Sequence, residues 1–511
     1  MQRINPKPLL DTSAWDEAVP DRYWLAYLIM YLLGVGSLLP WNTLITPTEY
    51  FQLRLAGSPF EGSFESILST SFTATSFVMV TWLQSLQRIL SLRLRILGGF
   101  ALLLLSIGTL MVLAIHPLFY SDAELLEQLA NGATSQFYAL VLCGALCGIG
   151  QAFLTVSAMS YAALFKRPTY LQAVSGGQGV AGLSVALANI ILKVPSTLQG
   201  CSNGDGEGAA GAVDVSRTTA THAREVVVAA ATYFTASCVV VLLCVLGFII
   251  VERLPFTRAR KRMGLATPFN ALRPPDSEAG SSTSRTSPWD VPPLPPRDAA
   301  GDAVGAAGAT PLQAVVRHDD ELRAAADASV GSVQLATELW KWSVSIFFVY
   351  TVTIAIFPSL TVTIVASSGS CAWKALFVPI GFAVFNLGDT IGRNLPCILT
   401  SQNTILGAVC ARLLFAPLFM LCYTGSAADG EAGPLQLPVF GLTDALPWTF
   451  MLAFSVSNGW LTSSVFVASQ SAVEPGRREQ AASLLVCLLN SGIFFGAMLS
   501  FVVRYLVRCR L

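Results

Sequence analysis

Long apolar runs separated by short polar segments fill most of this chain of 511 residues. A transmembrane helix needs roughly 20 consecutive, predominantly apolar residues, and eleven runs in the sequence reach about that length. The pattern therefore predicts eleven membrane-spanning helices. The predicted spans cover approximately 23–46, 64–86, 94–115, 136–163, 170–193, 226–250, 339–365, 375–399, 402–423, 446–469 and 480–503.

One long polar segment, 252–338, separates six predicted spans from five. It begins with basic residues and continues with many Pro, Ser, Gly and Ala, a composition typical of disordered linkers. We therefore expect an N-terminal bundle over 1–251, a disordered cytosolic tether over 252–338 and a C-terminal bundle over 339–511. In such a 6+5 arrangement a site between the bundles is exposed alternately to each side as the bundles rock against each other.

Composition agrees with this prediction. The chain is 53% hydrophobic and only 12% charged, whereas soluble domains carry roughly 25% charged residues. With a mean hydropathy of +0.59, the chain is expected to be an all-α polytopic membrane protein. Its formal net charge of zero gives no indication of a nucleic-acid partner, and the lipid bilayer is the expected surrounding.

The loops differ in charge on the two sides of the predicted membrane. Lys and Arg occur in the N-terminus and in the loops after predicted spans 2, 4, 6 and 10, whereas 117–135 and 424–445 carry carboxylates and neither Lys nor Arg. Basic loops stay on the cytosolic side of a membrane. We therefore expect a cytosolic N-terminus.

The predicted span 375–399 carries two charges within an otherwise apolar run. Asp389 and Arg393 lie four residues apart and share one face of a helix, together with Asn386. A charge at the centre of a bilayer costs roughly 2.5–3.5 kcal/mol, so this face should look into the protein and not into lipid. The pattern predicts one wall of a polar pocket.

Other predicted spans carry polar or aromatic residues whose roles the sequence leaves open. Gln151 has an amide that suits either the edge of a nucleobase or a neighbouring helix. Trp41 suits either a pocket wall or an interface anchor. Pro40 is expected to break its helix and free a backbone carbonyl, for which Asn42 is a plausible partner.

The segment 177–182 matches the pattern GxGxxG and contains Gln178. A dinucleotide site needs that pattern between a strand and a helix, and here it lies inside a predicted span. We therefore interpret these glycines as helix-packing residues, with Gln178 as a candidate polar contact. No Walker motif and no nucleophile–base pair stands out, so neither a cofactor nor an enzymatic activity is expected.

The eleven cysteines are scattered and mostly lie in apolar runs, which is typical of small packing residues. Cys201 and Cys371 differ because both fall in predicted loops on one side of the membrane. A disulfide between these two residues is the alternative to two free thiols.

Several of these motifs together resemble the equilibrative nucleoside transporter family. The pattern Asn-x-x-Asp-x-x-Gly-Arg within 385–393 is the most specific of them, and 50–59 is similar to the fungal branch of the family, which is often vacuolar. The resemblance spans nearly the whole chain outside the N-terminus and the tether. Its motifs are Pro40-Trp41-Asn42, Gln151, 177–182, Phe357-Pro358, 385–393 and Ser457-Asn458-Gly459.

The resemblance implies an eleven-span variant of the major facilitator fold and assigns roles to individual residues. Gln151 would meet the nucleobase, and Asp389 and Arg393 would meet the ribose hydroxyls. The remaining residues expected to bind substrate are Trp41, Leu38, Asn386 and Gln178, and those expected at an outer gate are Ile45, Pro358 and Phe382, braced by Asn42.

We therefore predict facilitated diffusion of purine and pyrimidine nucleosides, with nucleobases as a further substrate class. Under this prediction Asp389→Asn and Gln151→Ala leave folding largely intact while transport falls. Proton-coupled transport through Asp389 is one alternative. A second is an organic-cation or monoamine carrier, against which Gln178 counts because the cation-carrying branch has a carboxylate in this span.

A third alternative is a receptor or scaffold in which the tether is the working part. The tether also contains Arg-Thr-Ser-Pro at 285–288, a candidate site for a kinase. The sequence leaves open whether the protein resides in the plasma membrane or in a vacuolar or lysosomal membrane.

Overall fold

The computed structural model describes residues 21–203, 215–258, 334–422 and 444–508, apart from residues 62, 88, 122–123, 126–128, 130–131, 166 and 368. All regular elements within these ranges are helices, joined by short 3-10 turns. Most of the predicted tether, including the candidate kinase site, lies outside the described residues. The α-helices are α2 (Leu25–Ile45), α3 (Thr48–Leu55), α4 (Phe64–Leu86), α5 (Leu92–Ile115), α7 (Ala133–Ala163), α8 (Pro168–Asn203), α9 (Val215–Arg253), α12 (Trp340–Ile356), α13 (Cys371–Asn394), α14 (Gln402–Ala411), α15 (Phe415–Met420), α16 (Ala445–Ser471) and α17 (Arg478–Arg508).

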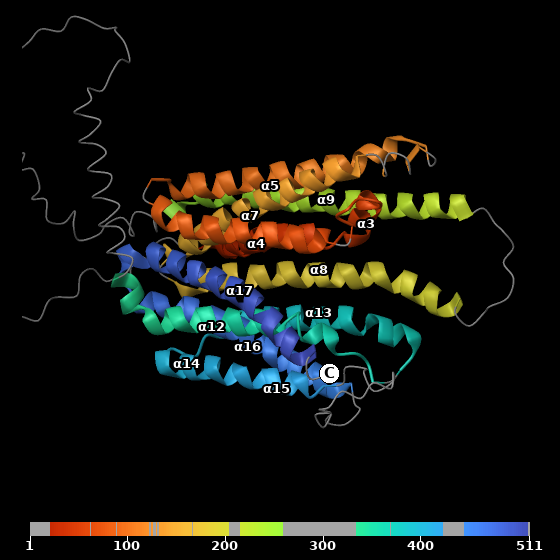
Figure 1. The fold of residues 1–511 in the computed structure, drawn as a ribbon. Coiled ribbons are helices and arrows are strands. Elements are labelled where there is room, and N and C mark those ends of the chain that lie inside the picture. The colour runs from red at the N-terminus through yellow and green to blue at the C-terminus, as the bar shows by residue number, and fades with distance from the viewer. Residues whose placement is uncertain are drawn as a thin grey trace, which may run out of the picture.

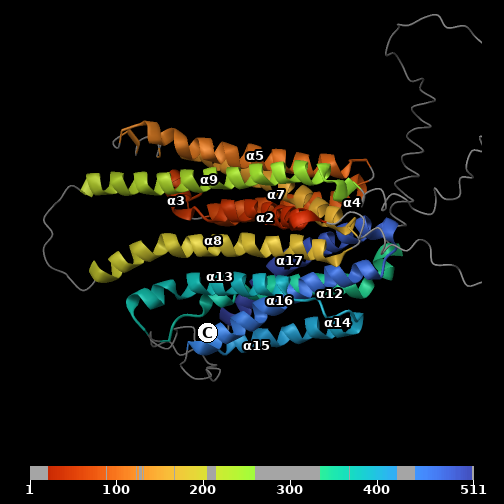
Figure 2. The same ribbon diagram turned by 180° about the vertical axis from the view of Figure 1, so that it is seen from behind.

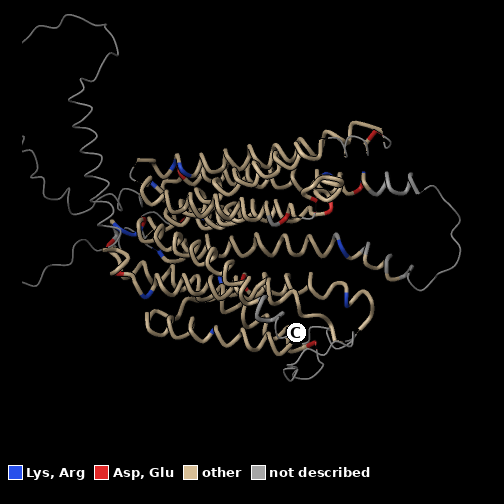
Figure 3. The backbone as a smooth tube through the Cα atoms, viewed as in Figure 1, with Lys and Arg blue, Asp and Glu red and all other residues tan. Residues whose placement is uncertain are grey.

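Ten helical stretches in the described part of the chain are long and apolar enough to cross a membrane. The long helices run roughly parallel or antiparallel to one another (Figure 1), and charged residues gather mainly at their ends (Figure 3). The protein is therefore a multi-pass integral membrane protein. The predicted count of eleven spans is not confirmed, since α4, a helix of 23 residues, is not among these ten stretches.

The first predicted span is one continuous helix, α2, with Pro40 inside it. The expectation that Pro40 breaks this helix was therefore wrong, since proline is tolerated in membrane helices when nearby groups satisfy the backbone. The Asn42 side chain donates a hydrogen bond to the carbonyl of Leu38 at 3.2 Å. The carbonyl that Pro40 leaves without a backbone donor is that of Gly36, so Asn42 bonds a different carbonyl from the one expected.

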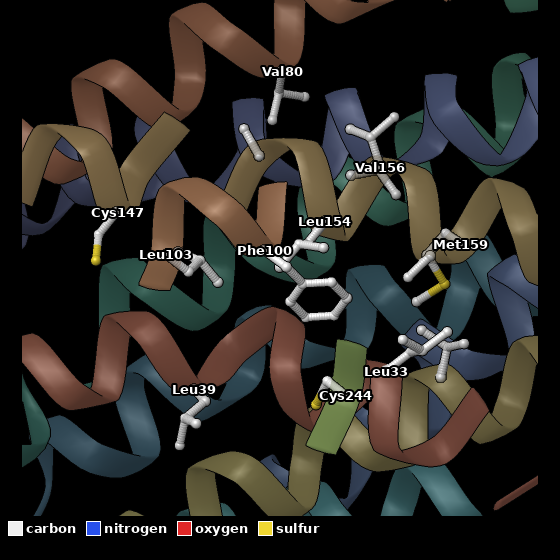
Figure 4. Packing of buried hydrophobic residues seen from close by; sticks show 14 of the residues in the cluster. Leu33, Leu39, Val80, Phe100, Leu103, Cys147, Leu154, Val156, Met159 and Cys244 are labelled. Carbon is white, nitrogen blue, oxygen red and sulfur yellow. The ribbon is translucent and has the colours of Figure 1, made fainter. Parts of the chain in front are cut away.

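A large apolar core holds α2, α5, α7 and α9 together. Figure 4 shows Phe100 and Leu103 of α5 among side chains from α2, α7 and α9. Cys147 and Cys244 are fully buried in this core without a disulfide, as expected for small packing residues. A second cluster joins α12, α13, α15 and α16.

Helix α8 lies between α2 and α13 (Figure 2). Gly34 of α2 lies against the carbonyl of Val174 in α8, and Gly177 of α8 lies against the carbonyl of Tyr31 in α2, so a Cβ at either glycine would overlap that backbone oxygen. On another face of α8, Gly179 lies against α13. The glycines of 177–182 therefore allow close helix packing, as the sequence predicted.

The two ends of the molecule differ. We call the end that holds the α4–α5, α7–α8 and α16–α17 connections the tether end, and the opposite end the disulfide end. At the disulfide end Cys201 and Cys371 form a disulfide with a Cα–Cα distance of 5.8 Å, which joins α8 to α13 and confirms that alternative. Helices α8 and α9 extend past their neighbours at this end (Figure 2).

Candidate functional site

Asp389 and Arg393 form a buried ion pair on one turn of α13. Arg393 Nε donates to Asp389 Oδ2 at 2.6 Å, and the two residues are only 7% and 5% exposed. The spacing of four residues predicted this pairing. The pair lies where α13 and α16 approach closely, since Gly459 of α16 lies against the backbone carbonyl of Asp389.

Asn458 supplies the second partner of the Asp389 carboxylate. Its Nδ2 donates to Asp389 Oδ1 at 2.7 Å, so each carboxylate oxygen holds one donor from the protein. Each oxygen keeps lone pairs that can accept further hydrogen bonds. Asp389 is therefore able to accept hydroxyl groups of a ligand without giving up its partners.

The Arg393 guanidinium connects three helices directly, and a fourth, α2, through Gln178. Its Nη2 donates to the Tyr350 hydroxyl on α12 at 3.0 Å, and its Nη1 donates to Ser175 Oγ at 3.2 Å and Gln178 Oε1 at 3.3 Å, both on α8. Gln178 in turn donates from Nε2 to Ser37 Oγ on α2 at 3.2 Å. The contacts of Arg393 thus reach from α13 to both α12 and the α2–α8 pair.

A second arginine, Arg412, extends these contacts on the other side of Asp389. It lies in η5 (Arg412–Leu414), between α14 and α15, and is 1% exposed. Its Nη2 donates to Thr353 Oγ1 at 2.7 Å and to Asn458 Oδ1 at 3.4 Å. We call the connected set the buried polar network, which consists of Ser37, Ser175, Gln178, Tyr350, Thr353, Asp389, Arg393, Arg412 and Asn458.

This network suits the binding of a neutral polar ligand better than it suits catalysis or metal binding. Asp389 is its only carboxylate, whereas acid–base catalysis often uses a pair of carboxylates. The network also has no nucleophile next to a general base. No group of three or more metal-ligating side chains occurs in the part of the chain that the structure describes. The arrangement offers one carboxylate, Asp389, among two arginines and several hydroxyl and amide groups.

Four expected site residues lie outside the network, and three of them belong to α2 and α7. Gln151 on α7 is half-buried, and its Oε1 is buried without a hydrogen-bond partner. Trp41 packs on Phe72 of α4 with ring centroids 4.6 Å apart, and Leu38 is half-buried one turn before it. Among the described residues, no hydrogen bond joins Gln151 or Trp41 to the buried polar network.

Asn386 shares α13 with the ion pair but has a local partner. Its Nδ2 donates to the carbonyl of Phe382 at 2.8 Å, and its side chain lies against Gly182 of α8. Asn386 therefore borders the α8–α13 contact one turn before Asp389.

The expected gate residues lie towards the disulfide end and are accessible. Ile45 is 41% exposed, Pro358 is exposed and Phe382 is half-buried. The ring of Phe382 lies 5.0 Å from that of Phe357, and both rings line an apolar cavity together with Trp448. Asn42 lies within α2 near Ile45, and its backbone carbonyl accepts a hydrogen bond from Thr46 Oγ1 at 2.7 Å.

Sequence reasoning missed several members of the network. Asn458 stood in a recognised motif but was assigned no role, and Tyr350 and Ser175 gave no signal beyond being polar residues in apolar runs. Arg412 did carry a signal, because it is a charge inside the predicted span 402–423. A charge at such a position is expected to serve a function.

Comparison with known proteins gives consistent matches. The family model described as nucleoside transporter matches residues 205–505. The chain is 27% identical to equilibrative nucleoside transporter 2 of Homo sapiens, over 96% of this chain and 99% of that protein. It is 26% identical to equilibrative nucleoside transporter 4 of Homo sapiens, over 99% of this chain and 88% of that protein.

Among solved structures, the chain is similar to the major facilitator superfamily transporter FucP in the outward conformation. The TM-score is 0.44 at 13% sequence identity, and the alignment covers 95% of this chain and 99% of that one.

Proposed function

This chain belongs to the nucleoside transporter family, and from that premise we propose that it carries nucleosides across a membrane by facilitated diffusion. The family is one of transporters and not of enzymes. The observation that carries the proposal is the buried Asp389–Arg393 pair within the membrane-spanning part of α13. Such a costly pair in a membrane interior marks a functional site, and its free lone pairs suit the hydroxyls of a neutral sugar.

We further propose that the substrate lies between the two chain halves, with residues 1–251 and 339–511 as separate bundles. Asp389 and Arg393 contact the ribose hydroxyls. Gln151 contacts the nucleobase, and its unpartnered buried Oε1 supports this role. Leu38 and Trp41 form apolar walls, and Asn386 and Gln178 border the ribose end of the site.

Alternating access between these bundles explains the two unlike ends of the molecule. At the tether end, Arg95 of α5 pairs with Glu479 of α17, and Gln172 of α8 donates to the carbonyl of Leu395 after α13 at 2.7 Å. At the disulfide end, Ile45 and Pro358 remain exposed. These contacts support a conformation that is closed at the tether end, with Ile45, Pro358 and Phe382 as the gate of the other end.

With a cytosolic N-terminus, the tether end faces the cytosol and the disulfide faces the opposite side. The basic loops of the tether end support this orientation. A kinase acting on 285–288 and residence in the plasma membrane or in a vacuolar membrane remain predictions from the sequence.

The proposal is tested by uptake of labelled uridine and adenosine into proteoliposomes that hold the purified protein. We expect saturable uptake that an inward proton gradient does not change. Accumulation only in the presence of the gradient would replace facilitated diffusion with proton coupling. The absence of uptake of both nucleosides by folded protein would contradict the proposal.

Gln151→Ala tests the assignment of the nucleobase contact. We expect its uridine uptake to fall about tenfold or more, because a lost hydrogen bond to a buried polar group has about that effect. Gln136→Ala is the matched control, since Gln136 is also half-buried on α7 but lies more than three turns away. Equal uptake by the two variants would remove Gln151 from the site.

A further inference from the structure

Arg412 is a buried cation without a direct ion pair. It lies within the membrane-spanning stretch Gln402–Met420, and among the described residues no carboxylate comes within ion-pairing distance of it. Its Nη1 donates to the carbonyl of Phe454 at 2.9 Å and to Ser457 Oγ, and its guanidinium lies 4.4 Å from the centre of the Phe454 ring. A charge buried at such a cost calls for a reason beyond anchoring η5.

The direction of its hydrogen bonds links Arg412 to the carboxylate of the site. Arginine only donates hydrogen bonds and a carboxylate only accepts them. The Asn458 amide between the two groups must therefore turn Oδ1 towards Arg412 and Nδ2 towards Asp389, as observed at 3.4 and 2.7 Å. Thr353, which accepts from Arg412, lies 2.7 Å from the same Oδ1 and supports this orientation.

The charges of the network do not balance. Asp389 contributes one negative charge, and Arg393 and Arg412 contribute one positive charge each. Tyr350 contributes a hydroxyl that accepts a hydrogen bond from Arg393. The elements packed around Asp389 that complete the network, α8 and α16, contribute only Ser, Gln and Asn to it. The network as a whole therefore carries one net positive charge.

We propose that Arg412 is a positioning and specificity-determining residue of the nucleoside site. It fixes the Asn458 amide and thereby the Asp389 carboxylate for the ribose hydroxyls, and its charge disfavours cationic ligands. This role rests on the proposed transport of nucleosides. Arg412 would thus set the orientation of the group that accepts the ribose hydroxyls and would repel cations. Exclusion of cations distinguishes a nucleoside carrier from an organic-cation carrier.

The test compares uptake of uridine and 2′,3′-dideoxyuridine in proteoliposomes, because the dideoxy compound lacks the hydroxyls that Asp389 accepts. In Arg412→Met we expect the preference for uridine to fall about tenfold, through a higher KM for uridine, since a hydrogen bond to a charged group is worth about that factor. We also expect tetraethylammonium to inhibit uridine uptake at roughly a tenfold lower concentration than in the wild type, because one repelling charge is gone.

Two further variants separate charge from geometry. Arg412→Lys keeps the charge but loses the planar fork of donors, so cation exclusion should return while the preference for uridine stays reduced. Thr353→Val removes the supporting hydroxyl but keeps both arginines. We therefore expect a reduced preference for uridine with cation exclusion retained. Thr353→Val also keeps the proposal testable if Arg412→Met does not fold.

Ser457→Ala is the control for a purely structural role. It removes a contact of Arg412 that does not lead to Asp389, and the preference for uridine should remain that of the wild type. If Arg412→Met and Thr353→Val lower the uptake of uridine and 2′,3′-dideoxyuridine equally, the positioning role is overturned. If tetraethylammonium inhibits Arg412→Met no better than the wild type, the charge role is overturned. A wild-type protein without uridine uptake would instead contradict the proposed function itself.

Discussion

Each charged side chain of the buried polar network reaches several partners, which explains how three charges persist in a membrane interior. Arg393 bonds to Asp389, Tyr350, Ser175 and Gln178. A buried ion pair is tolerated when its remaining donors and acceptors are satisfied, and removing one partner is then strongly destabilising. Stability therefore depends on side chains that we propose to bind the substrate.

Asp389→Asn should consequently impair stability as well as transport. The substitution leaves Arg393 buried without a countercharge, and breaking such a pair typically costs about 3–5 kcal/mol. We expect uridine uptake close to background and a clearly lower unfolding temperature in detergent. This result would correct the prediction from sequence that Asp389→Asn leaves folding largely intact, which did not take the burial of Arg393 into account.

The double variant Asp389→Asn/Arg393→Met separates the two effects. The double variant no longer buries an arginine without a countercharge. Its unfolding temperature should therefore recover in part, while uptake stays absent. If the single variant is as stable as the wild type, Arg393 has enough partners without Asp389 and the argument from burial is wrong.

The one contact of the site that the sequence predicted joins residues close along the chain. Asp389 and Arg393 are one helical turn apart, so spacing alone predicted their contact. Asn458 reaches the same site from α16 through the packing of α13 against α16, and Arg412 reaches it from η5 through its contact with α16. The packing role of Gly177 was likewise predicted from the motif, but its partner on α2 was not.

At the scale of elements, α8 is the helix on which both halves of the chain meet. It packs against α2 through Gly34 and Gly177, against α13 through Gly179, and it carries two partners of Arg393. It is also joined covalently to α13 at the disulfide end. A change in the tilt of α8 would therefore move two hydrogen-bond partners of Arg393 directly.

Gly177→Ala tests the close approach of α8 to α2. A Cβ there would overlap the carbonyl of Tyr31, and overpacking of this kind costs about 1–3 kcal/mol, so the unfolding temperature should fall. Gly108→Ala on α5 is the control, because no atom lies near its added Cβ and alanine favours a helix over glycine. A Gly177→Ala protein as stable as Gly108→Ala would mean that α2 and α8 separate without cost.

Cys201→Ser tests the covalent link between α8 and α13. The disulfide joins residues 170 positions apart, and cross-links that close long loops stabilise by typically about 2–4 kcal/mol. We expect a lower unfolding temperature for this variant than for the wild type. Added reductant should lower the wild type to the same value and leave Cys201→Ser unchanged. Loss of stability in reductant by the variant as well would point to another cause.

At the scale of the whole molecule, polar groups without a hydrogen-bond partner are buried near the tether end. Gln470 of α16 is 6% exposed, and both its Nε2 and Oε1 lack a hydrogen-bond partner. Ser157 of α7 and Thr462 of α16 are also buried with unpartnered hydroxyls. A buried unsatisfied polar group costs about 1–3 kcal/mol. These groups therefore favour a second conformation in which water reaches their side chains. Contacts such as Arg95–Glu479 must oppose that opening.

Glu479→Gln should therefore shift the protein towards a conformation open at the tether end. The substitution leaves the fully buried Arg95 without its carboxylate, so the closed state loses an ion pair that the open state does not need. Opening hydrates Gln470, and a Gln470→Cys reporter should react faster with a thiol reagent in the Glu479→Gln background.

Leu103→Cys is the matched control, because Leu103 is buried within the α5–α7 core (Figure 4) and stays buried when the ends rearrange. Faster labelling at both positions would indicate partial unfolding, and unchanged labelling at Gln470→Cys would mean that Arg95 and Glu479 do not hold the tether end closed.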